Sequence, residues 1–99
     1  MAHLLIWSRR ASEDLAEIAA YIAQDSEVYS ASVVRTILRK TSTLREFPMA
    51  GRMVPEFHNP SLREIFAYSY RIIYQVDSTQ VSVAAIVHGR RNLDLALKP

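Results

Sequence analysis

The chain has 99 residues, of which 49% are hydrophobic and 22% are charged, and its formal net charge is +2. This size and composition are typical of one folded domain over residues 1–99 with a single modest core, and they exclude a disordered chain. No apolar run is long enough to cross a bilayer, the first residues do not resemble a signal peptide, and cysteine is absent, so we expect a cytoplasmic protein that does not bind membranes.

The first half of the chain is expected to be mostly helical. A short apolar strand over 3–7 is followed by Ser8, a candidate N-cap for a first helix. After a break at 24–26, a second helix is expected over 27–46, and Pro48 ends it. The short connection predicts that the two helices form an antiparallel hairpin.

The second half is expected to be mostly strands. An irregular loop over 48–61 leads to a strand over 62–67, and a tight turn then opens a hairpin made by 70–76 and 81–91. Residues 92–97 could form a terminal turn of helix. The order β-α-α-β-β-β predicts an α+β fold in which the helical hairpin packs on a small, mainly antiparallel sheet.

The hairpin pattern predicts which side chains share a face of the sheet. With 77–80 as the loop, Val76 lies opposite Val81 and Tyr74 opposite Val83, which gives an apolar face toward the helices. Ala85 and Val87 are expected on that same face.

The other face of this hairpin is expected to carry its polar residues. In the same register Arg71 becomes a diagonal neighbour of His88, and Ile73 lies exposed between the polar side chains. Arg90 and Arg91 follow His88 directly, so the pattern predicts a cationic group at one edge of the sheet.

A group of this kind is compatible with a metal-free ribonuclease. Arginines would stabilise the charged phosphate, and His88 would transfer protons. The alternative is structural: Arg71 pairs with a carboxylate such as Glu64, and His88 only ends a strand. Geometry alone favours this structural alternative, because ordinary ion-pair networks also bring charges together.

No other standard site is indicated by the sequence. Two glycines do not make a phosphate-binding loop, and no cofactor motif is present. The three histidines are too widely spaced to suggest a metal site: His3, His58 and His88. The acidic residues of the first helix are expected in solvent: Glu13, Asp14 and Glu17.

Several stretches in order resemble one known family. They are the stretch over 8–23 that begins Ser-Arg-Arg-Ala, Phe-Pro-Met-Ala-Gly-Arg within 44–52, and the strands 62–65, 70–74 and 86–91, the last ending in His-Gly-Arg-Arg. Together they resemble toxins of the RelE/ParE superfamily, the toxic halves of bacterial type II toxin–antitoxin modules. The resemblance implies the same β-α-α-β-β-β fold. It also implies a cognate antitoxin: a small acidic protein with a DNA-binding N-terminal part and a flexible C-terminal segment that wraps the toxin.

The resemblance leaves two biochemical branches open. RelE-like toxins cleave mRNA on the ribosome, and in that case Arg71 and Arg91 would stabilise the phosphate while His88 acts as general acid or base. ParE-like toxins bind DNA gyrase and need no catalytic residue. The chain has only two lysines with which to grip ribosomal RNA, and its Phe-Pro-x-x-Gly-Arg and His-Gly-Arg-Arg elements resemble the ParE-like branch more closely.

We therefore expect a gyrase-binding toxin, with the ribosome-dependent nuclease as the alternative and an inactive binding module as a third class. The candidate binding residues are Arg63, Arg71, His88, Arg90 and Arg91. The antitoxin is expected to dock on the exposed side of the helical hairpin and on sheet residues such as Ile73.

Overall fold

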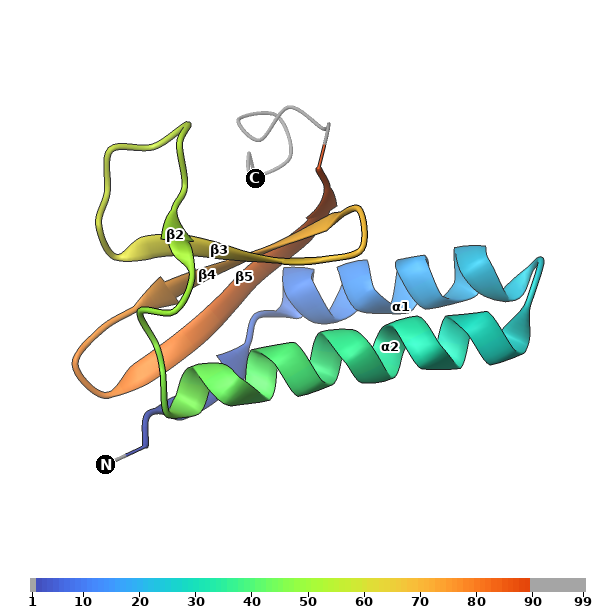
Figure 1. Cartoon of the computed structure of the whole chain (residues 1–99), viewed down its shortest axis with the longest axis horizontal. Helices are drawn as coiled ribbons and strands as arrows, with labels where there is room; N and C mark the ends of the chain where they lie inside the picture. The colour runs from blue at the N-terminus through green and yellow to red at the C-terminus, as the bar shows by residue number, and fades with distance from the viewer. Residues whose placement is uncertain (1, 90–99) are drawn as a thin grey trace.

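A helical hairpin lies against one face of a five-stranded sheet in the computed structural model, which describes residues 2–89 (Figure 1). The strands run in the spatial order β1-β5-β4-β3-β2, with β1 parallel to β5 and the other neighbours antiparallel. The expected α+β fold is confirmed. The elements are β1 (Leu4–Trp7), α1 (Arg9–Ala23), α2 (Glu27–Ser42), the 3₁₀ turn η1 (Thr43–Arg45), β2 (Arg52–Met53), β3 (Leu62–Ala67), β4 (Tyr70–Val76) and β5 (Gln80–His88).

Serine side chains cap both helices. The Ser8 hydroxyl oxygen accepts a hydrogen bond from the Ala11 amide at 3.0 Å, and Ser26 does the same for the Tyr29 amide at 3.0 Å. The prediction that Ser8 begins the first helix is therefore confirmed, because each cap satisfies an amide that has no partner within its helix.

The second helix is shorter than the sequence suggested. It ends at Ser42 and tightens into η1, whereas the pattern predicted a helix up to residue 46. The hydroxyl groups of Thr41 and Thr43 donate to the helix carbonyls of Ile37 and Lys40 at 3.1 and 2.7 Å. Such bonds compete with the regular helical ladder, and a 3₁₀ turn is a frequent result at a helix end.

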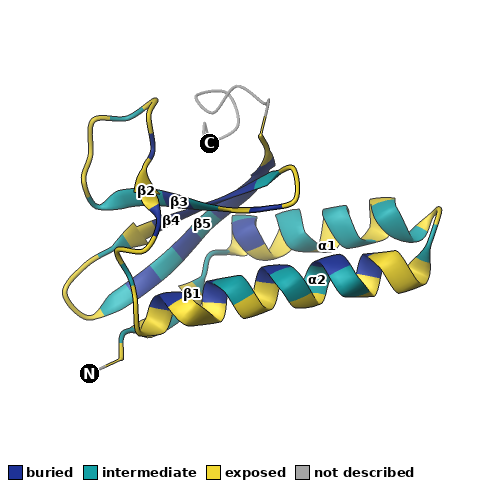
Figure 2. Cartoon of the chain, in the orientation of Figure 1, coloured by how far each residue is buried: buried dark blue, intermediate teal, exposed yellow. Residues whose placement is uncertain are grey.

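Both faces of the sheet are covered (Figure 2). The helices cover one face over a core that includes Val33, Ile37 and Ile72. On the other face a second core contains Val54, Ile73, Ala85 and Val87, with Phe57 and Leu62 packed against it. The segment expected to be an irregular loop thus includes β2 and supplies Val54 and Phe57 to this second core. Ile73 is fully buried, so the prediction that it is exposed for docking is wrong.

The register of the β4–β5 hairpin changes along its length. Near the turn it follows the prediction, with Val76 opposite Val81 and Tyr74 opposite Val83. A bulge then leaves Ala84 as an extra residue, so that beyond it Ile73 lies opposite Ala85. Side chains after the bulge consequently occupy the face opposite to the expected one. Ala85 and Val87 pack under the β2–β3 segment, away from the helices.

The first helix holds the backbone on both sides of this bulge. The Ser8 hydroxyl donates to the Ala84 carbonyl at 3.0 Å, and an Asp14 carboxylate oxygen accepts from the Ile86 amide at 2.9 Å. The sequence placed Asp14 in solvent, but its side chain is 12% exposed and also pairs with Arg10 at 3.0 Å. The pairing of β1 with β5 ends at Val83. Beyond that point, the contacts of Ser8 and Asp14 satisfy main-chain groups of β5, which gives a physical reason for the shift in register.

Candidate functional site

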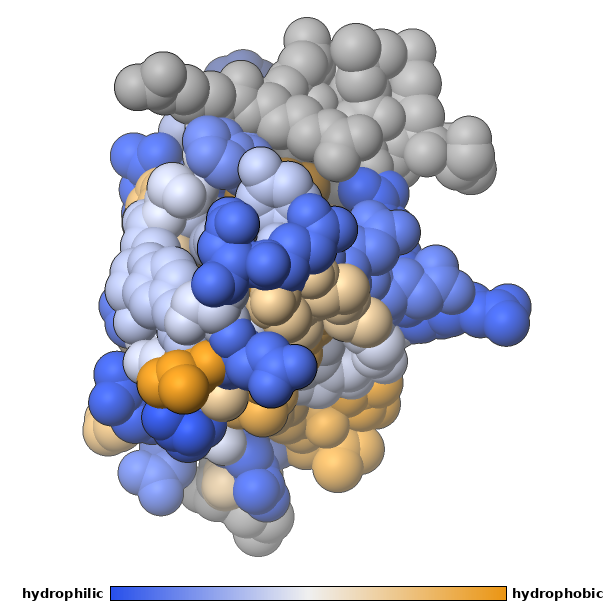
Figure 3. Space-filling view, turned by 90° about the vertical axis from the view of Figure 1, so that its right-hand side faces the viewer, coloured by the Kyte–Doolittle hydropathy of each residue, from blue (hydrophilic) through white to orange (hydrophobic). Residues whose placement is uncertain are grey.

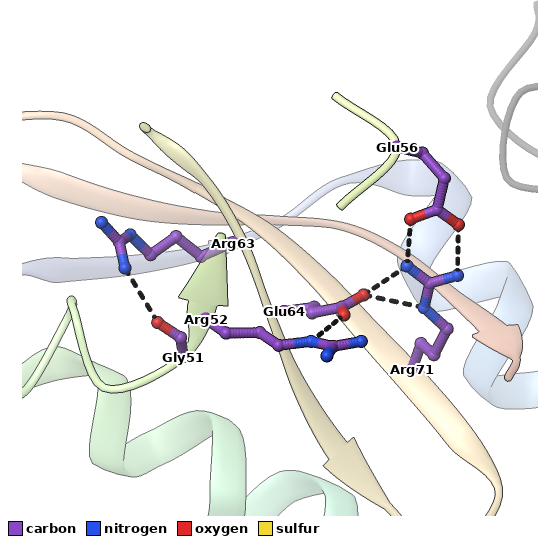
Figure 4. Close-up of polar contacts among 6 residues, drawn as sticks. All are labelled: Gly51, Arg52, Glu56, Arg63, Glu64 and Arg71. Carbon is purple, nitrogen blue, oxygen red and sulfur yellow. Dashed lines mark hydrogen bonds and ion pairs between the residues drawn. The ribbon is translucent and has the colours of Figure 1, made fainter. Parts of the chain in front are cut away.

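Arg71 is the second residue of β4. It lies on the sheet face away from the helices and is only 5% exposed. Its Nε donates to Glu64 Oε1 at 2.7 Å, while Nη1 and Nη2 donate to the two oxygens of Glu56 at 2.7 and 2.8 Å (Figure 4). The guanidinium therefore makes a fork-to-fork pair with one carboxylate and a further charge-assisted bond with a second.

Glu64 extends this arrangement into an alternating row of charges. Its carboxylate is buried, and its second oxygen accepts from Arg52 Nε at 2.6 Å (Figure 4). The guanidinium of Arg52 also lies 5.1 Å from the centre of the Phe66 ring. The row Glu56–Arg71–Glu64–Arg52 has two positive and two negative groups, so its formal charge is balanced. We call these four residues the ion network.

Within the ion network, Arg71 and Glu56 hold each other in their charged forms. Hydrogen bonding to Glu56, followed by Glu64, raises the pKa of Arg71 above its ordinary value. Hydrogen bonding from Arg71 in turn lowers the pKa of Glu56. Neither group can exchange a proton near neutral pH, and the charge of Arg71 is already neutralised within the protein.

Arg63 has a structural contact pattern. Its Nη1 donates to the Gly51 carbonyl and its Nε to the Pro60 carbonyl, both at 3.0 Å (Figure 4 shows the first). One guanidinium thus links the backbone just before β2 with the backbone just before β3. This use of the donors leaves fewer of them for an external partner.

Gly51 is required for the same segment to approach the sheet. A Cβ atom at this position would lie 2.5 Å from the Glu64 carbonyl oxygen and 2.5 Å from the Tyr74 hydroxyl. The Gly51 amide donates to that hydroxyl at 2.9 Å, and the hydroxyl donates to the Pro48 carbonyl at 2.9 Å. Burial raises the pKa of Tyr74, so this phenol remains a donor.

His88 lies on the other side of the sheet from Arg71. It is opposite Tyr70 in the register, with the ring centroids 6.1 Å apart in an edge-to-face arrangement. Both residues line a hollow of about 200 Å³ beside α1, together with Asp14 and Glu17. The prediction that Arg71 and His88 emerge together is therefore wrong, and its cause is the Ala84 bulge. Arg90 and Arg91 lie outside the described residues.

The sequence identified Glu64 as a partner of Arg71 but missed Glu56, Arg52 and the role of Asp14. Glu56 and Arg52 belong to a segment without periodicity, so no pattern places them beside Arg71. The contact of Asp14 is with the main chain of β5, so no pattern within the first helix indicates it. In residues 2–89 every buried side-chain nitrogen and oxygen has a hydrogen-bond partner.

Two other features, a metal-binding cluster and a membrane-spanning helix, are absent from residues 2–89. No three His, Asp or Glu side chains gather there in a way that would hold a metal ion. Neither helix between residues 2 and 89 has the length and apolar character needed to span a membrane.

Comparisons with known proteins identify the family. Residues 5–93 match the profile of the family described as ParE toxin of type II toxin-antitoxin system, parDE. A comparison of the sequence with curated proteins found no match.

Three solved structures are similar in fold. A chain from the chromosomal ParDE system of P. aeruginosa has a TM-score of 0.72 at 19% identity, covering 88% of this chain and 96% of that one. An arginine-to-alanine double mutant of E. coli toxin RelE in the free state has a TM-score of 0.67 at 21% identity, covering 91% and 86%. The RelBE2 toxin–antitoxin complex of Mycobacterium tuberculosis has a TM-score of 0.60 at 18% identity, covering 89% and 99%.

These three structures share the fold and include both RelE and ParE toxins, so fold similarity does not separate the two branches. The profile match covers most of the chain. The protein belongs to the ParE toxin family of type II toxin–antitoxin systems.

Proposed function

We propose that the chain is a toxin that inhibits DNA gyrase by binding it, and that a cognate antitoxin neutralises it in the cytoplasm. The observation that carries this proposal is the ion network: Arg71 is buried and bound by Glu56 and Glu64. The arginine that an RNA-cleaving site would need is thereby used within the fold.

A ribonuclease site needs a cation and a proton-transfer group close together, and Arg71 and His88 do not lie on the same face of the sheet. The phosphate needs an accessible cation, and the 2′-hydroxyl and the leaving oxygen need proton-transfer groups within hydrogen-bond reach. A phosphate would have to displace the carboxylate of Glu56 from Arg71. His88 lies on the opposite face of the sheet from Arg71, so it cannot share a phosphate with that arginine.

A protein ligand makes smaller demands. Binding needs exposed apolar side chains with complementary charge around them, and no reactive group. The described surface exposes several large apolar side chains, among them Phe47, Met49 and Met53 around the segment that precedes and forms β2. Candidate contact residues with positive charge remain Arg63, Arg90 and Arg91.

The central experiment incubates the purified chain with DNA gyrase, ATP and supercoiled plasmid, followed by detergent and protease. We expect linear plasmid to accumulate in proportion to the chain. A parallel reaction contains translating ribosomes and a defined mRNA, and we expect that message to stay intact. Message cut at defined codons, with plasmid unaffected, would reject the proposal in favour of the nuclease branch.

The variant Glu56→Gln sharpens this comparison. It removes one negative charge beside Arg71 and makes the guanidinium more available to a phosphate. A latent ribonuclease would cleave message faster in this variant than in the wild type. The gyrase proposal predicts no cleavage of message by either protein. Glu13→Gln, which removes an exposed negative charge on α1, serves as the matched surface control.

A further inference from the structure

A hollow lies between α1 and the adjoining ends of β4 and β5, and its volume is about 200 Å³. Sites for drug-sized ligands measure about 300–1,000 Å³, so this hollow has room for a single long side chain. We call it the α1–β5 hollow. It is lined by Asp14, Glu17, Ile18, Tyr21, Tyr70, Ile86, Val87 and His88.

One face of α1 forms one wall of this hollow. Asp14, Glu17, Ile18 and Tyr21 follow the spacing i, i+3, i+4 and i+7, which places them side by side on the helix surface. Glu17 and Tyr21 are therefore neighbours one turn apart, and Tyr21 is 70% exposed. This wall combines carboxylates with an aromatic ring.

The opposite wall is aromatic and apolar. The Tyr70 and His88 rings meet edge-to-face with their centroids 6.1 Å apart, and Ile86 is buried. Aromatic faces attract cations, and the planar guanidinium of arginine can also stack on them. The walls thus suit an arginine side chain better than an anion.

The two carboxylates of the α1–β5 hollow are not equivalent. Asp14 already accepts from the Ile86 amide at 2.9 Å and from Arg10 Nε at 3.0 Å. Glu17 is exposed, and no cation within residues 2–89 lies within ion-pair distance of its carboxylate. The hollow therefore carries one negative charge that the described part of the fold does not neutralise.

The nearby surface favours recognition by charge. The end of the molecule at which the two helices project is mainly hydrophilic, with separate hydrophobic patches (Figure 3). An acidic segment, which is the kind expected of the antitoxin, would meet the Glu17 carboxylate with like charge. A basic side chain of the target would meet it with opposite charge, so complementarity favours the target as the source of the occupant.

We propose that the α1–β5 hollow binds one arginine side chain of the target protein as an anchor of that interface. The guanidinium pairs with Glu17 and lies on the Tyr21 ring, and the methylene groups of the side chain pack on Ile18 and Tyr70. An arginine held in a fitted pocket is a frequent hot spot of protein interfaces. The identity of the target rests on the proposed function, which names DNA gyrase.

The first test titrates N-acetylarginine methylamide into the full-length chain, labelled with ¹⁵N. We expect amide shifts to concentrate at 14–21, 70 and 86–88. The matched probe is N-acetylcitrulline methylamide, which has nearly the same shape without the charge and should bind at least about tenfold more weakly. Shifts that concentrate elsewhere, or equal binding of the two probes, would overturn the proposal.

Removal of the unpaired carboxylate gives the second arm. Glu17→Gln should weaken binding of the arginine probe by about tenfold. Glu13→Gln, the same change one turn earlier on α1, should leave it unchanged, because Glu13 pairs with Arg9 and does not line the hollow. A spectrum that matches the wild type outside the hollow shows that each variant is folded. Equal losses in both variants would mean that net charge alone attracts the probe, and would overturn the proposal.

The chain's own Arg90 and Arg91, which follow His88 closely in the sequence, are the competing occupants. The double variant Arg90→Gln/Arg91→Gln should bind the arginine probe with the affinity of the wild type. Shifts that appear only in the double variant would show that the chain fills the hollow itself, and would overturn the proposal.

The gyrase reaction tests the assignment to the target. Glu17→Gln should require about tenfold more protein than the wild type to linearise the plasmid, and Glu13→Gln should require no more. A wild-type response of Glu17→Gln, together with its weaker binding of the probe, would overturn the assignment to gyrase. If the wild type itself leaves the plasmid intact, the proposed function fails and the assignment to gyrase fails with it. The two probe titrations decide separately whether the hollow takes an arginine.

Discussion

Arg71 is a buried charge that binds carboxylates from two separate segments, Glu56 and Glu64. Its removal would leave the carboxylate of Glu64 buried with only Arg52 as a charged partner. Breaking a buried ion pair by removing one member is costly, because the remaining charge has lost its solvent and its partner. A role of this kind is structural, whatever molecule the toxin binds.

We expect Arg71→Ala to lower the free energy of unfolding by about 3–5 kcal/mol. Urea titration followed by far-UV circular dichroism measures this loss. The control is Arg9→Ala, which removes an exposed pair with Glu13 at 3.4 Å and should change the midpoint little. A similar small change in Arg71→Ala would show that the ion network is dispensable.

Glu56 makes stability depend on pH in the acidic range. Its pKa in the folded chain lies below the ordinary value of 4.5, chiefly because Arg71 donates to it. The unfolded chain therefore binds a proton at this carboxyl before the folded chain does. The stabilisation is complete above a pH of about 4.5 and is lost as the pH falls through the folded pKa.

We expect the urea midpoint of the wild type to fall more steeply below pH 4.5 than that of Glu56→Gln, which has no carboxylate to protonate. Midpoints at a series of pH values above and below this point measure the difference. Asp77 also contributes acid sensitivity, since the Thr79 amide lowers its pKa, but both proteins share it. Parallel curves would contradict the assignment.

At the level of the elements, sequence patterns missed the hydrogen bonds that link Ser8 and Asp14 to the main chain of β5. We call this group of contacts the junction between α1 and β5. Hydrophobic periodicity located both helices and the bounds of β3 and β4, because each has a regular apolar stripe or alternation. A bulge changes neither composition nor length in a recognisable way. Its backbone is held by hydrogen bonds from Ser8 and to Asp14, which lie more than seventy residues away in the sequence.

The junction can be tested by substitution. We expect Asp14→Ala to cost about 1–3 kcal/mol, since the Ile86 amide loses its acceptor, and Ser8→Ala to cost about 1–2 kcal/mol through loss of the helix cap and the Ala84 contact. Thermal melting of each single variant and the double variant measures these effects. The two should be non-additive because both act on one segment; simple addition would argue against a shared junction.

At the scale of the whole molecule, the two cores share strands. Ile72 belongs to the core under the helices, and its neighbour Ile73 belongs to the core under the β2–β3 segment. Neither layer can separate without disturbing β4 and β5. The sequence predicted the helix-covered core but left the second face polar, since the residues of 48–61 that cover it have no periodic pattern.

This sharing predicts one cooperative unfolding transition. Trp7, the single tryptophan, packs on the helix side, so its fluorescence monitors that layer. A second tryptophan, introduced by Phe57→Trp in a Trp7→Phe background, monitors the other layer. The two urea curves, each compared with circular dichroism of the same protein, should coincide. A separate early transition at residue 57 would show that the β2–β3 segment unfolds independently.

The extra residue at Ala84 also affects how relatives of this chain should be aligned. If side chains of β5 are assigned to alternate faces starting from the hairpin turn, His88 falls on the same face as Arg71. The bulge at Ala84 reverses this assignment, so that His88 lies on the opposite face. In a relative without the extra residue, a histidine at the end of β5 would lie next to the arginine of β4. In this chain the two side chains lie on opposite faces. A one-residue gap at this point of an alignment therefore separates two groups of relatives. In one group the residue at the end of β5 shares a sheet face with the β4 arginine, and in the other it does not.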